Sequence, residues 1–131
     1  MKDITLHYGA SKILHGIDMT AEVGEICCLM GSNGVGKTSL LKVMAGAHPS
    51  SGGSYHLNGQ AVAGRKAHQL AAAGVGYVPQ GRDIFPLMTV KENLETGFAC
   101  LPRSEHHIPG HIYDLFPALK KMTNRRGGDL S

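Results

Sequence analysis

Alternating apolar and polar side chains predict two half-buried strands near the start of the chain, at residues 4–8 and 17–23. Residues 26–30 are apolar on both faces and lie between glycines, which is typical of a strand buried in a parallel sheet. Residues 75–78 are expected to form another short buried strand. The apolar pattern therefore predicts strands in the early and middle parts of the chain.

A helix is predicted over residues 37–45, where three apolar side chains share one face and Gly46 is well placed to end it. Those side chains are Leu40, Leu41 and Met44. A second helix is expected over residues 67–73. Another helix begins at Thr89, because Thr89 and Glu92 nearly fulfil the capping-box pattern.

A short hairpin is predicted between residues 54–57 and 60–62, because the turn pair Asn58-Gly59 separates them. Residues 50–53, before this hairpin, are expected to form a loop. The last third of the chain is expected to hold short helical pieces separated by prolines. Since strands and helices alternate along the chain, the predicted fold class is α/β.

The composition is that of an ordinary single globular domain: 131 residues, of which 42% are hydrophobic and 18% charged. The net charge of +3 is too small to indicate a nucleic-acid surface, so no nucleic-acid partner is expected. No apolar run approaches the roughly 20 residues that cross a bilayer, and no secretory signal is visible. Cys27 and Cys28 are expected to be small core residues, and with Cys100 they make no disulfide framework. These observations favour a cytosolic protein.

Residues 31–38 read GSNGVGKT and match Gly-x4-Gly-Lys-Ser/Thr, the loop that binds nucleoside triphosphates. The loop lies between a predicted buried strand and a predicted helix, which is the context that this motif requires. Glycines let the main chain approach phosphate oxygens closely, and a helix start favours anions. Lys37 is expected to reach the β- and γ-phosphates of the nucleotide, and Thr38 is expected to bind Mg²⁺. The residues expected to contact the nucleotide in this segment are Gly31, Ser32, Asn33, Gly34, Val35, Gly36, Lys37, Thr38 and Ser39.

Other kinds of site fit the sequence less well. A dinucleotide-binding loop is excluded, because Ser39 stands where Gly-x-Gly-x-x-Gly needs its last glycine. A histidine metal site is not expected, because Pro109 and Gly110 interrupt the helix that His107 and His111 would need. A kinase or GTPase is disfavoured, since no Asn-Lys-x-Asp motif occurs in the chain.

The order of strand, GSNGVGKT, helix, YVPQ (residues 77–80) and TV-x-ENL (residues 89–94) resembles the ATP-binding subunit of an ABC transporter, over essentially the whole chain. The stretches PQGRDIFP, IPGHIYDLFPALKKM and RRGGDLS are similar to the urea-type subunits within the branched-chain amino acid uptake group. The resemblance implies the P-loop NTPase core of an ABC nucleotide-binding domain with an N-terminal antiparallel β subdomain, in incomplete form. It implies that residues 1–86 are the nucleotide-binding core with the Walker A loop and the Q-loop. Residues 87–131 would then begin the helical subdomain and stop at the start of the signature motif.

The resemblance also assigns roles to single residues. Tyr8 matches the family's aromatic residue that stacks on adenine. Gln80 matches the glutamine that touches Mg²⁺ and water and senses the membrane subunit. By this match Lys37 and Gln80 are the expected catalytic residues, and Thr38 and Gln80 the expected Mg²⁺ ligands.

Partners and location follow from the same resemblance. Phe85 and the helix expected over residues 89–98 correspond to the surface that docks on the transmembrane subunits. The expected partners are transmembrane permease subunits and a second ATP-binding subunit, identical or paralogous. The protein would be peripheral to the cytoplasmic face of the inner membrane, where it would couple ATP to uptake of a small polar solute such as urea or a branched-chain amino acid.

The chain departs from the family in length. Subunits of this kind run to roughly 200 residues or more, whereas this sequence stops at Leu130-Ser131, the first two residues of Leu-Ser-Gly-Gly-Gln. None of the ten acidic residues follows a run of four apolar residues, as a Mg²⁺-binding aspartate or catalytic glutamate at a sheet end would. We expect the chain to bind ATP without hydrolysing it appreciably, because phosphoryl transfer needs metal and base together. A truncated nucleotide-binding or interaction module without catalysis is the alternative hypothesis.

Overall fold

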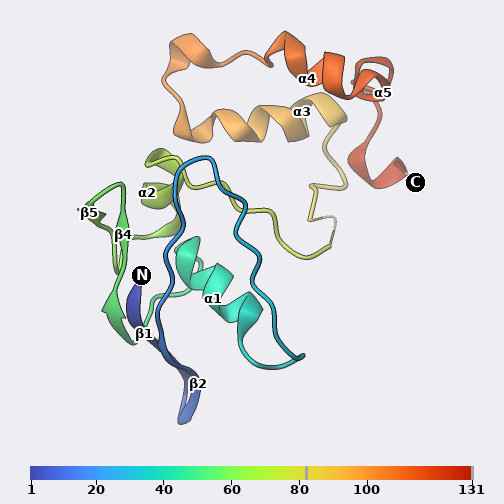
Figure 1. Ribbon diagram of the computed structural model, residues 1–131. Helices are drawn as coiled ribbons and strands as arrows, with labels where there is room; N and C mark the ends of the chain where they lie inside the picture. The colour runs from blue at the N-terminus through green and yellow to red at the C-terminus, as the bar shows by residue number, and fades with distance from the viewer. Residues whose placement is uncertain (82, 131) are drawn as a thin grey trace. The chain divides into compact units, whose positions relative to one another are not determined.

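A computed structural model describes residues 1–81 and 83–130 of the chain (Figure 1). The chain divides into two compact units, Met1–Gly76 and Tyr77–Ser131. The functional division expected after residue 86 stays a prediction. Of the two residues expected to begin the signature motif, Leu130 is described, and Ser131 lies outside the described residues. Within these residues, no helix combines the length and apolar character that crossing a membrane requires.

The first unit is built on a three-stranded antiparallel sheet with the order β2-β1-β3. Its strands are β1 (Lys2–Tyr8), β2 (Ser11–Ile17) and β3 (Gly52–Ser54). The strand predicted at residues 4–8 is therefore confirmed, while the segment predicted as loop at 50–53 partly joins the sheet. The alternation in β1 leaves Ile4 and Leu6 fully buried, so one face of the sheet supplies the core.

The strand predicted over residues 17–23 is wrong, because the second strand lies earlier in the chain. Gly9 has φ 58°, and the turn that it starts lets Ser11 pair with Tyr8. The second strand therefore follows this turn directly and ends at Ile17. Residues 18–23 show the alternation but form no strand, because a strand also needs a neighbouring strand to hydrogen-bond with its main-chain groups.

Helix α1 (Lys37–Met44) agrees with the predicted helix and packs its buried residues, Leu40 and Val43, into the core of the first unit. The prediction of its buried face is wrong in one position, because Leu41 is 43% exposed. Gly46 takes φ 68° and its N–H donates to the Val43 carbonyl, which ends the helix as expected. The core of this unit comprises Ile4, Leu6, Leu14, Leu40, Val43, Tyr55, Val62 and Leu70.

The predicted hairpin and second helix are also confirmed. Strands β4 (His56–Leu57) and β5 (Gln60–Ala61) pair antiparallel across Asn58 and Gly59, both of which have positive φ. Helix α2 (Ala67–Ala72) follows and buries Leu70 in the core. These elements depend on sequence signals only a few residues apart.

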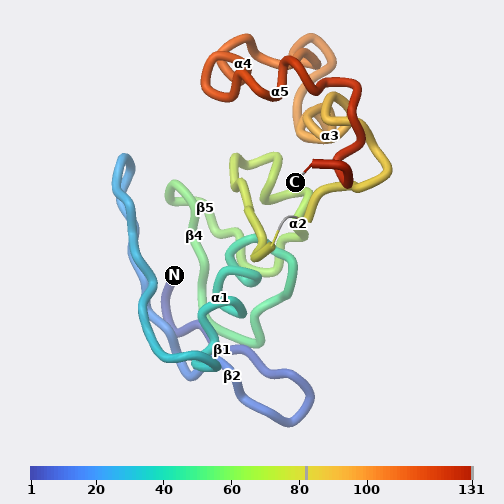
Figure 2. Tube along the Cα trace, turned by 90° about the vertical axis from the view of Figure 1, so that its right-hand side faces the viewer, coloured from blue at the N-terminus to red at the C-terminus, as the bar shows by residue number. Residues whose placement is uncertain are grey.

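Two predicted buried strands, at residues 26–30 and 75–78, are not formed. Ile26 is 100% exposed and Val78 is 90% exposed. Cys27 and Cys28 are exposed as well, so their expected place in a core is wrong. In Figure 2 the first of these segments belongs to a long excursion of the chain between β2 and α1. The physical reason is that a parallel strand needs hydrogen-bonded neighbours, and none of the described residues pairs with either segment.

The second unit consists of short helices. They are α3 (Val90–Glu95), η1 (Thr96–Cys100), η2 (Arg103–Glu105), α4 (Gly110–Leu115), α5 (Pro117–Lys121) and η3 (Gly127–Asp129). The short pieces predicted for the last part of the chain are confirmed, whereas the single helix expected over residues 89–98 is divided into an α-helix and a 3-10 helix. Pro102 and Pro109 precede η2 and α4, and Pro117 begins α5. Proline cannot donate a main-chain hydrogen bond, so it separates helices or stands in their first turn.

The predicted capping box at the start of α3 is confirmed. The Thr89 N–H donates to Glu92 Oε2 at 2.7 Å, and the Glu92 N–H donates to Thr89 Oγ1 at 3.2 Å. The hydrogen bonds that Thr89 donates hold the pKa of the Glu92 carboxyl below its usual value. The N–H of Val90 also donates to the Arg125 carbonyl, which ties the last part of the chain to the start of this helix.

Candidate functional site

The glycine-rich loop before α1 carries the candidate site of the first unit. Gly34 has φ 83° and Gly36 has φ 99°, which only glycine adopts at little cost. A Cβ atom at Gly36 would lie 2.8 Å from Cδ2 of Leu14, so this glycine also lets the loop pass close to β2. The last glycine of the loop therefore lies close against β2.

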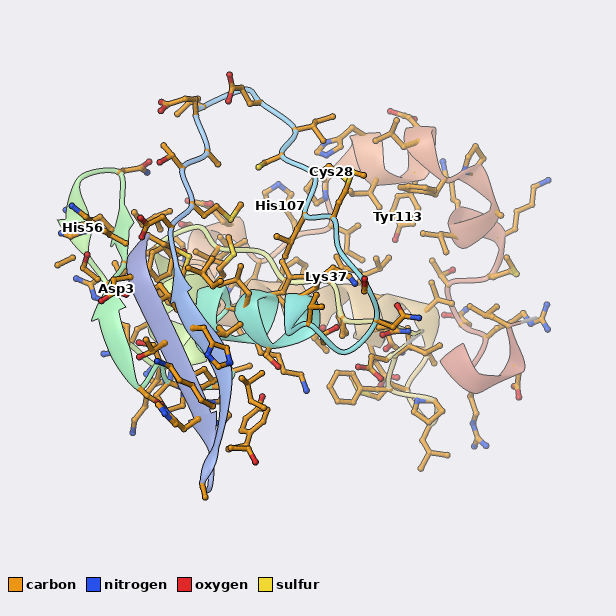
Figure 3. All side chains as sticks on the ribbon, turned by 60° about the horizontal axis from the view of Figure 1, so that its bottom comes forward. Asp3, Cys28, Lys37, His56, His107 and Tyr113 are labelled. Atoms are coloured by element: carbon orange, nitrogen blue, oxygen red, sulfur yellow. The ribbon has the colours of Figure 1, made fainter. Side chains whose placement is uncertain are left out.

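Lys37 closes the loop over the start of α1. Its Nζ donates hydrogen bonds to the carbonyl oxygens of Gly31 and Ser32, each at 2.7 Å. Because Lys37 is the first residue of the helix, these two bonds bring the beginning of the loop back to its end. Figure 3 labels Lys37 where the loop enters α1.

The start of α1 provides donors for an anion. The first N–H groups of a helix have no intrahelical acceptor, and the hydrogen bonds of α1 begin with Leu40 N–H donating to the Gly36 carbonyl at 2.9 Å. No acidic residue stands in the first turn of α1. The start of α1 therefore combines three features that favour phosphate binding: the positive end of the helix dipole, N–H groups without an intrahelical acceptor, and the Lys37 ammonium.

Two hydroxyl side chains follow the lysine. Thr38 is exposed and Ser39 is half-buried in the first turn of α1. A hydroxyl oxygen is a hard ligand of the type that Mg²⁺ takes beside phosphate oxygens and water. The exposed Thr38 hydroxyl, next to the lysine, fits one position in such a Mg²⁺ shell.

The other two predicted site residues lie in different units. Tyr8 is the last residue of β1 in the first unit, and its side chain is 41% exposed. Gln80 is exposed in an irregular segment of the second unit. The structure thus holds Tyr8 and the phosphate loop in one compact unit, whereas a contact of Gln80 with that loop stays a prediction.

Asn93 organises the segment that follows Gln80. In the sequence this residue was noted only as part of the TV-x-ENL motif, with no role of its own. Its Oδ1 accepts from the Phe85 N–H at 2.8 Å, and the two hydrogens of its Nδ2 are shared among the carbonyls of Phe85, Met88 and Thr89. Asparagine is a poor helix former, so its place inside a predicted helix is the signal that could have revealed this role.

A mostly apolar cavity of about 300 Å³ lies beside Asn93 in the second unit. Phe85, Leu94 and Leu119 are among the residues that line it, and Phe85 is 55% exposed. Among the residues that the structure describes, no three histidine, cysteine or acidic side chains are grouped to hold a metal ion.

A family model and curated relatives match most of the chain. The family model described as "ABC transporter" matches residues 14–128. The high-affinity branched-chain amino acid transport ATP-binding protein BraG of Pseudomonas aeruginosa is 30% identical over 129 residues, which are 98% of this chain and 55% of BraG. The ribose import ATP-binding protein RbsA of Oceanobacillus iheyensis is 37% identical over 97 residues, 74% of this chain and 20% of RbsA. The chain therefore spans about half the length of BraG and a fifth of RbsA.

Solved structures show the same fold. The ADP conformation of MJ1267, an ATP-binding cassette of an ABC transporter, has a TM-score of 0.75 at 22% identity and covers 99% of this chain and 57% of that one. The dimeric post-hydrolysis state of the ATP-binding cassette MJ0796, bound to ADP and Pi, has a TM-score of 0.77 at 21% identity, with coverages of 99% and 62%. The predicted α/β P-loop fold with its N-terminal antiparallel sheet is confirmed.

Proposed function

This chain belongs to the ABC transporter family, and on that premise we propose that it is part of the ATP-binding subunit of an importer. The observation that carries the proposal is the closed loop, in which Nζ of Lys37, the first residue of α1, donates to the carbonyls of Gly31 and Ser32. The first N–H groups of α1 have no acceptor within the helix. Triphosphate oxygens would take these N–H groups and the Lys37 ammonium as donors.

The residues of the proposed site have distinct roles. Lys37 meets the β- and γ-phosphates, and Thr38 offers its hydroxyl to Mg²⁺. Tyr8 presents an exposed aromatic face on which adenine stacks. Gln80 is proposed to contact Mg²⁺ and water and to convey the nucleotide state to the membrane subunit. Bound Mg²⁺ would neutralise charge that develops on the phosphates.

We propose that the transported solute is small and polar, such as urea or a branched-chain amino acid. BraG is named for branched-chain amino acid transport and RbsA for ribose import, which supports import in general. The urea-type similarity of residues 79–86, 108–122 and 125–131 supports the finer choice. The proposed location is the cytoplasmic face of the inner membrane.

The proposed partners are a transmembrane permease and a second ATP-binding subunit. Phe85 and the cavity that it lines offer an apolar surface for the permease. Residues 1–86 would bind the nucleotide, and residues 87–131 would begin the helical subdomain that contacts the permease. Capture of the permease by the wild-type chain, weakened in Phe85→Ser, would test this surface.

We also propose that these 131 residues bind ATP without appreciable hydrolysis. Support comes from the acidic residues, none of which follows a run of four apolar residues as a sheet-end catalytic carboxylate would. Without a base to orient the attacking water, the lysine and Mg²⁺ alone stabilise only part of the transition state.

Phosphate release from ATP tests this proposal directly. The wild-type chain and Lys37→Ala should both release phosphate at the background rate. Turnover by the wild type that disappears in Lys37→Ala would show a complete catalytic site and would contradict the proposal.

Uptake assays test the solute class. In cells whose chromosomal copy of the gene for this protein carries Lys37→Ala, uptake of the transported solute should fall, and labelled urea and labelled leucine are the two solutes to compare.

A further inference from the structure

We propose that His48 is a positioning residue that holds the Tyr8 ring ready for adenine and thereby joins the two ends of the nucleotide site. This inference rests on the proposed function, in which Tyr8 stacks on the base. Nothing in the loop motif points to His48, which lies ten residues beyond Thr38 in the sequence.

The contact between the two rings is edge-on. The centroids of Tyr8 and His48 lie 4.8 Å apart, and the ring planes meet at 77°. This is a favoured aromatic geometry, because the positive edge of one ring meets the negative face of the other. Such a contact covers at most one face of Tyr8, and the 41% exposure of Tyr8 leaves surface for a base to stack.

Tyr8 depends on this contact for its orientation. Its main chain is held at the end of β1, where it pairs with Ser11. Within residues 1–81 and 83–130, His48 is the ring that contacts the Tyr8 side chain. Without His48, the Tyr8 ring would be freer to change rotamer, and binding a base would require it to be ordered.

His48 is itself fixed at two points. Its N–H donates to the Lys42 carbonyl at 3.2 Å, at the end of α1. Its Nδ1 lies 2.9 Å from the Pro49 carbonyl oxygen, and since a carbonyl only accepts, Nδ1 carries the proton. The half-buried ring therefore cannot turn freely.

Helix α1 then connects both halves of the site. Lys37 begins the helix, and Lys42, in its last turn, holds the main chain of His48. Eight helical residues span about 12 Å. The start of this one rigid helix thus positions the Lys37 ammonium for the phosphates. Just beyond its end, His48 positions the Tyr8 ring for the base.

The test compares two ligands that share the triphosphate but not the base. Calorimetric titration with Mg·ATP and with Mg-tripolyphosphate is carried out on the wild type, His48→Ala and His48→Phe. His48→Ala should weaken ATP binding roughly three- to tenfold, as expected for the loss of one aromatic pair. Tripolyphosphate binding should not change, and His48→Phe, which keeps a ring, should restore most of the ATP affinity.

A double-mutant cycle with Tyr8→Ala separates positioning from a general effect on folding. In the Tyr8→Ala background, His48→Ala should have no further effect on ATP affinity, because the ring that it positions is gone. Equal weakening of ATP and tripolyphosphate, unchanged ATP affinity in His48→Ala, or failure of His48→Phe to restore binding would overturn the inference. If the wild type binds neither ligand, or if Lys37→Ala binds both as well as the wild type, the proposed function itself fails, and this inference fails with it.

Discussion

The Nζ atom of Lys37 lies 2.7 Å from the carbonyl oxygen of Gly31, six residues earlier in the chain. With a second bond to the next carbonyl, it closes the phosphate loop over the first turn of α1. The loop path therefore depends on a side chain that the proposed function also assigns to phosphate. Changes that reopen the loop should affect both stability and nucleotide binding.

Gly36 should tolerate alanine less well than Gly34. Both residues have positive φ, so alanine is strained at each by about 1–2 kcal/mol. A Cβ at Gly36 would also lie 2.8 Å from the buried Leu14 side chain, whereas at Gly34 nothing lies within 4 Å. We expect Gly36→Ala to lower the free energy of unfolding by about 1–3 kcal/mol more than Gly34→Ala. Urea unfolding of the two variants measures this, and equal losses would show that the close approach to β2 is unimportant.

Neighbouring leucines of α1 should differ strongly in their contribution to stability. Leu40 is 2% exposed and belongs to the core, while Leu41 is 43% exposed. Leu40→Ala should cost about 2–5 kcal/mol through lost burial and a residual cavity. Leu41→Ala should cost less than about 1 kcal/mol. Thermal or urea unfolding followed by circular dichroism decides this, and a larger loss for Leu41→Ala would mean that another face of α1 meets the sheet.

Acid should weaken the start of α3 through Glu92. Its folded pKa lies below the ordinary value of 4.5, because Thr89 donates hydrogen bonds to the carboxylate. A lowered folded pKa contributes stability that is present above the unfolded pKa and is lost as the pH falls through the folded pKa. The stability difference between the wild type and Glu92→Gln should thus be largest above pH 4.5 and shrink below it. Urea unfolding at several pH values measures the difference, and a pH-independent difference would rule out this role of the carboxylate.

Asn93 should need its amide group, since the two hydrogens of Nδ2 are shared among three main-chain carbonyls. Asn93→Asp keeps the shape but replaces this donor with an acceptor. We expect a loss of about 1–3 kcal/mol and faster hydrogen exchange at the Phe85 N–H, which bonds to Asn93 Oδ1. The exposed Asn124 provides the control, because Asn124→Asp makes the same chemical change in the same unit and should change neither quantity. If both variants behave alike, Asn93 does not organise the segment.

The elements that could be predicted from the sequence are those whose signals are local. The Thr89 and Glu92 cap, the Asn58-Gly59 turn and the end of α1 at Gly46 each depend on a few adjacent residues. Such signals act through main-chain geometry and nearby hydrogen bonds, so no distant partner is needed. The structure confirms all three.

Several of the predictions that required distant partners were wrong. Residues 26–30 are apolar enough for a buried strand, but pairing depends on neighbours that apolar character alone cannot reveal. The exposure of Leu41 depended on which face of α1 meets the sheet. The position of β2 was missed although its signal is local, because the prediction followed alternation rather than the turn at Gly9.

Some parts of the candidate site could be identified from the sequence, and others only from the structure. Spacing alone identified the phosphate loop, and the resemblance to a family identified Tyr8. The contact of His48 with Tyr8 joins residues 40 positions apart and could be found only in three dimensions. The bonds of Asn93 are local, yet the motif in which it stands did not reveal them.

Calorimetric titration of the 131-residue chain with ATP, in the presence and absence of Mg²⁺ and beside Lys37→Ala, tests the central claim most directly. We predict saturable binding at one site that Mg²⁺ strengthens. Lys37→Ala should weaken it roughly ten- to a hundredfold, as expected for the loss of charged hydrogen bonds. Absence of binding by the wild type, or equal affinity in Lys37→Ala, would contradict the assignment of residues 31–38 as the triphosphate site.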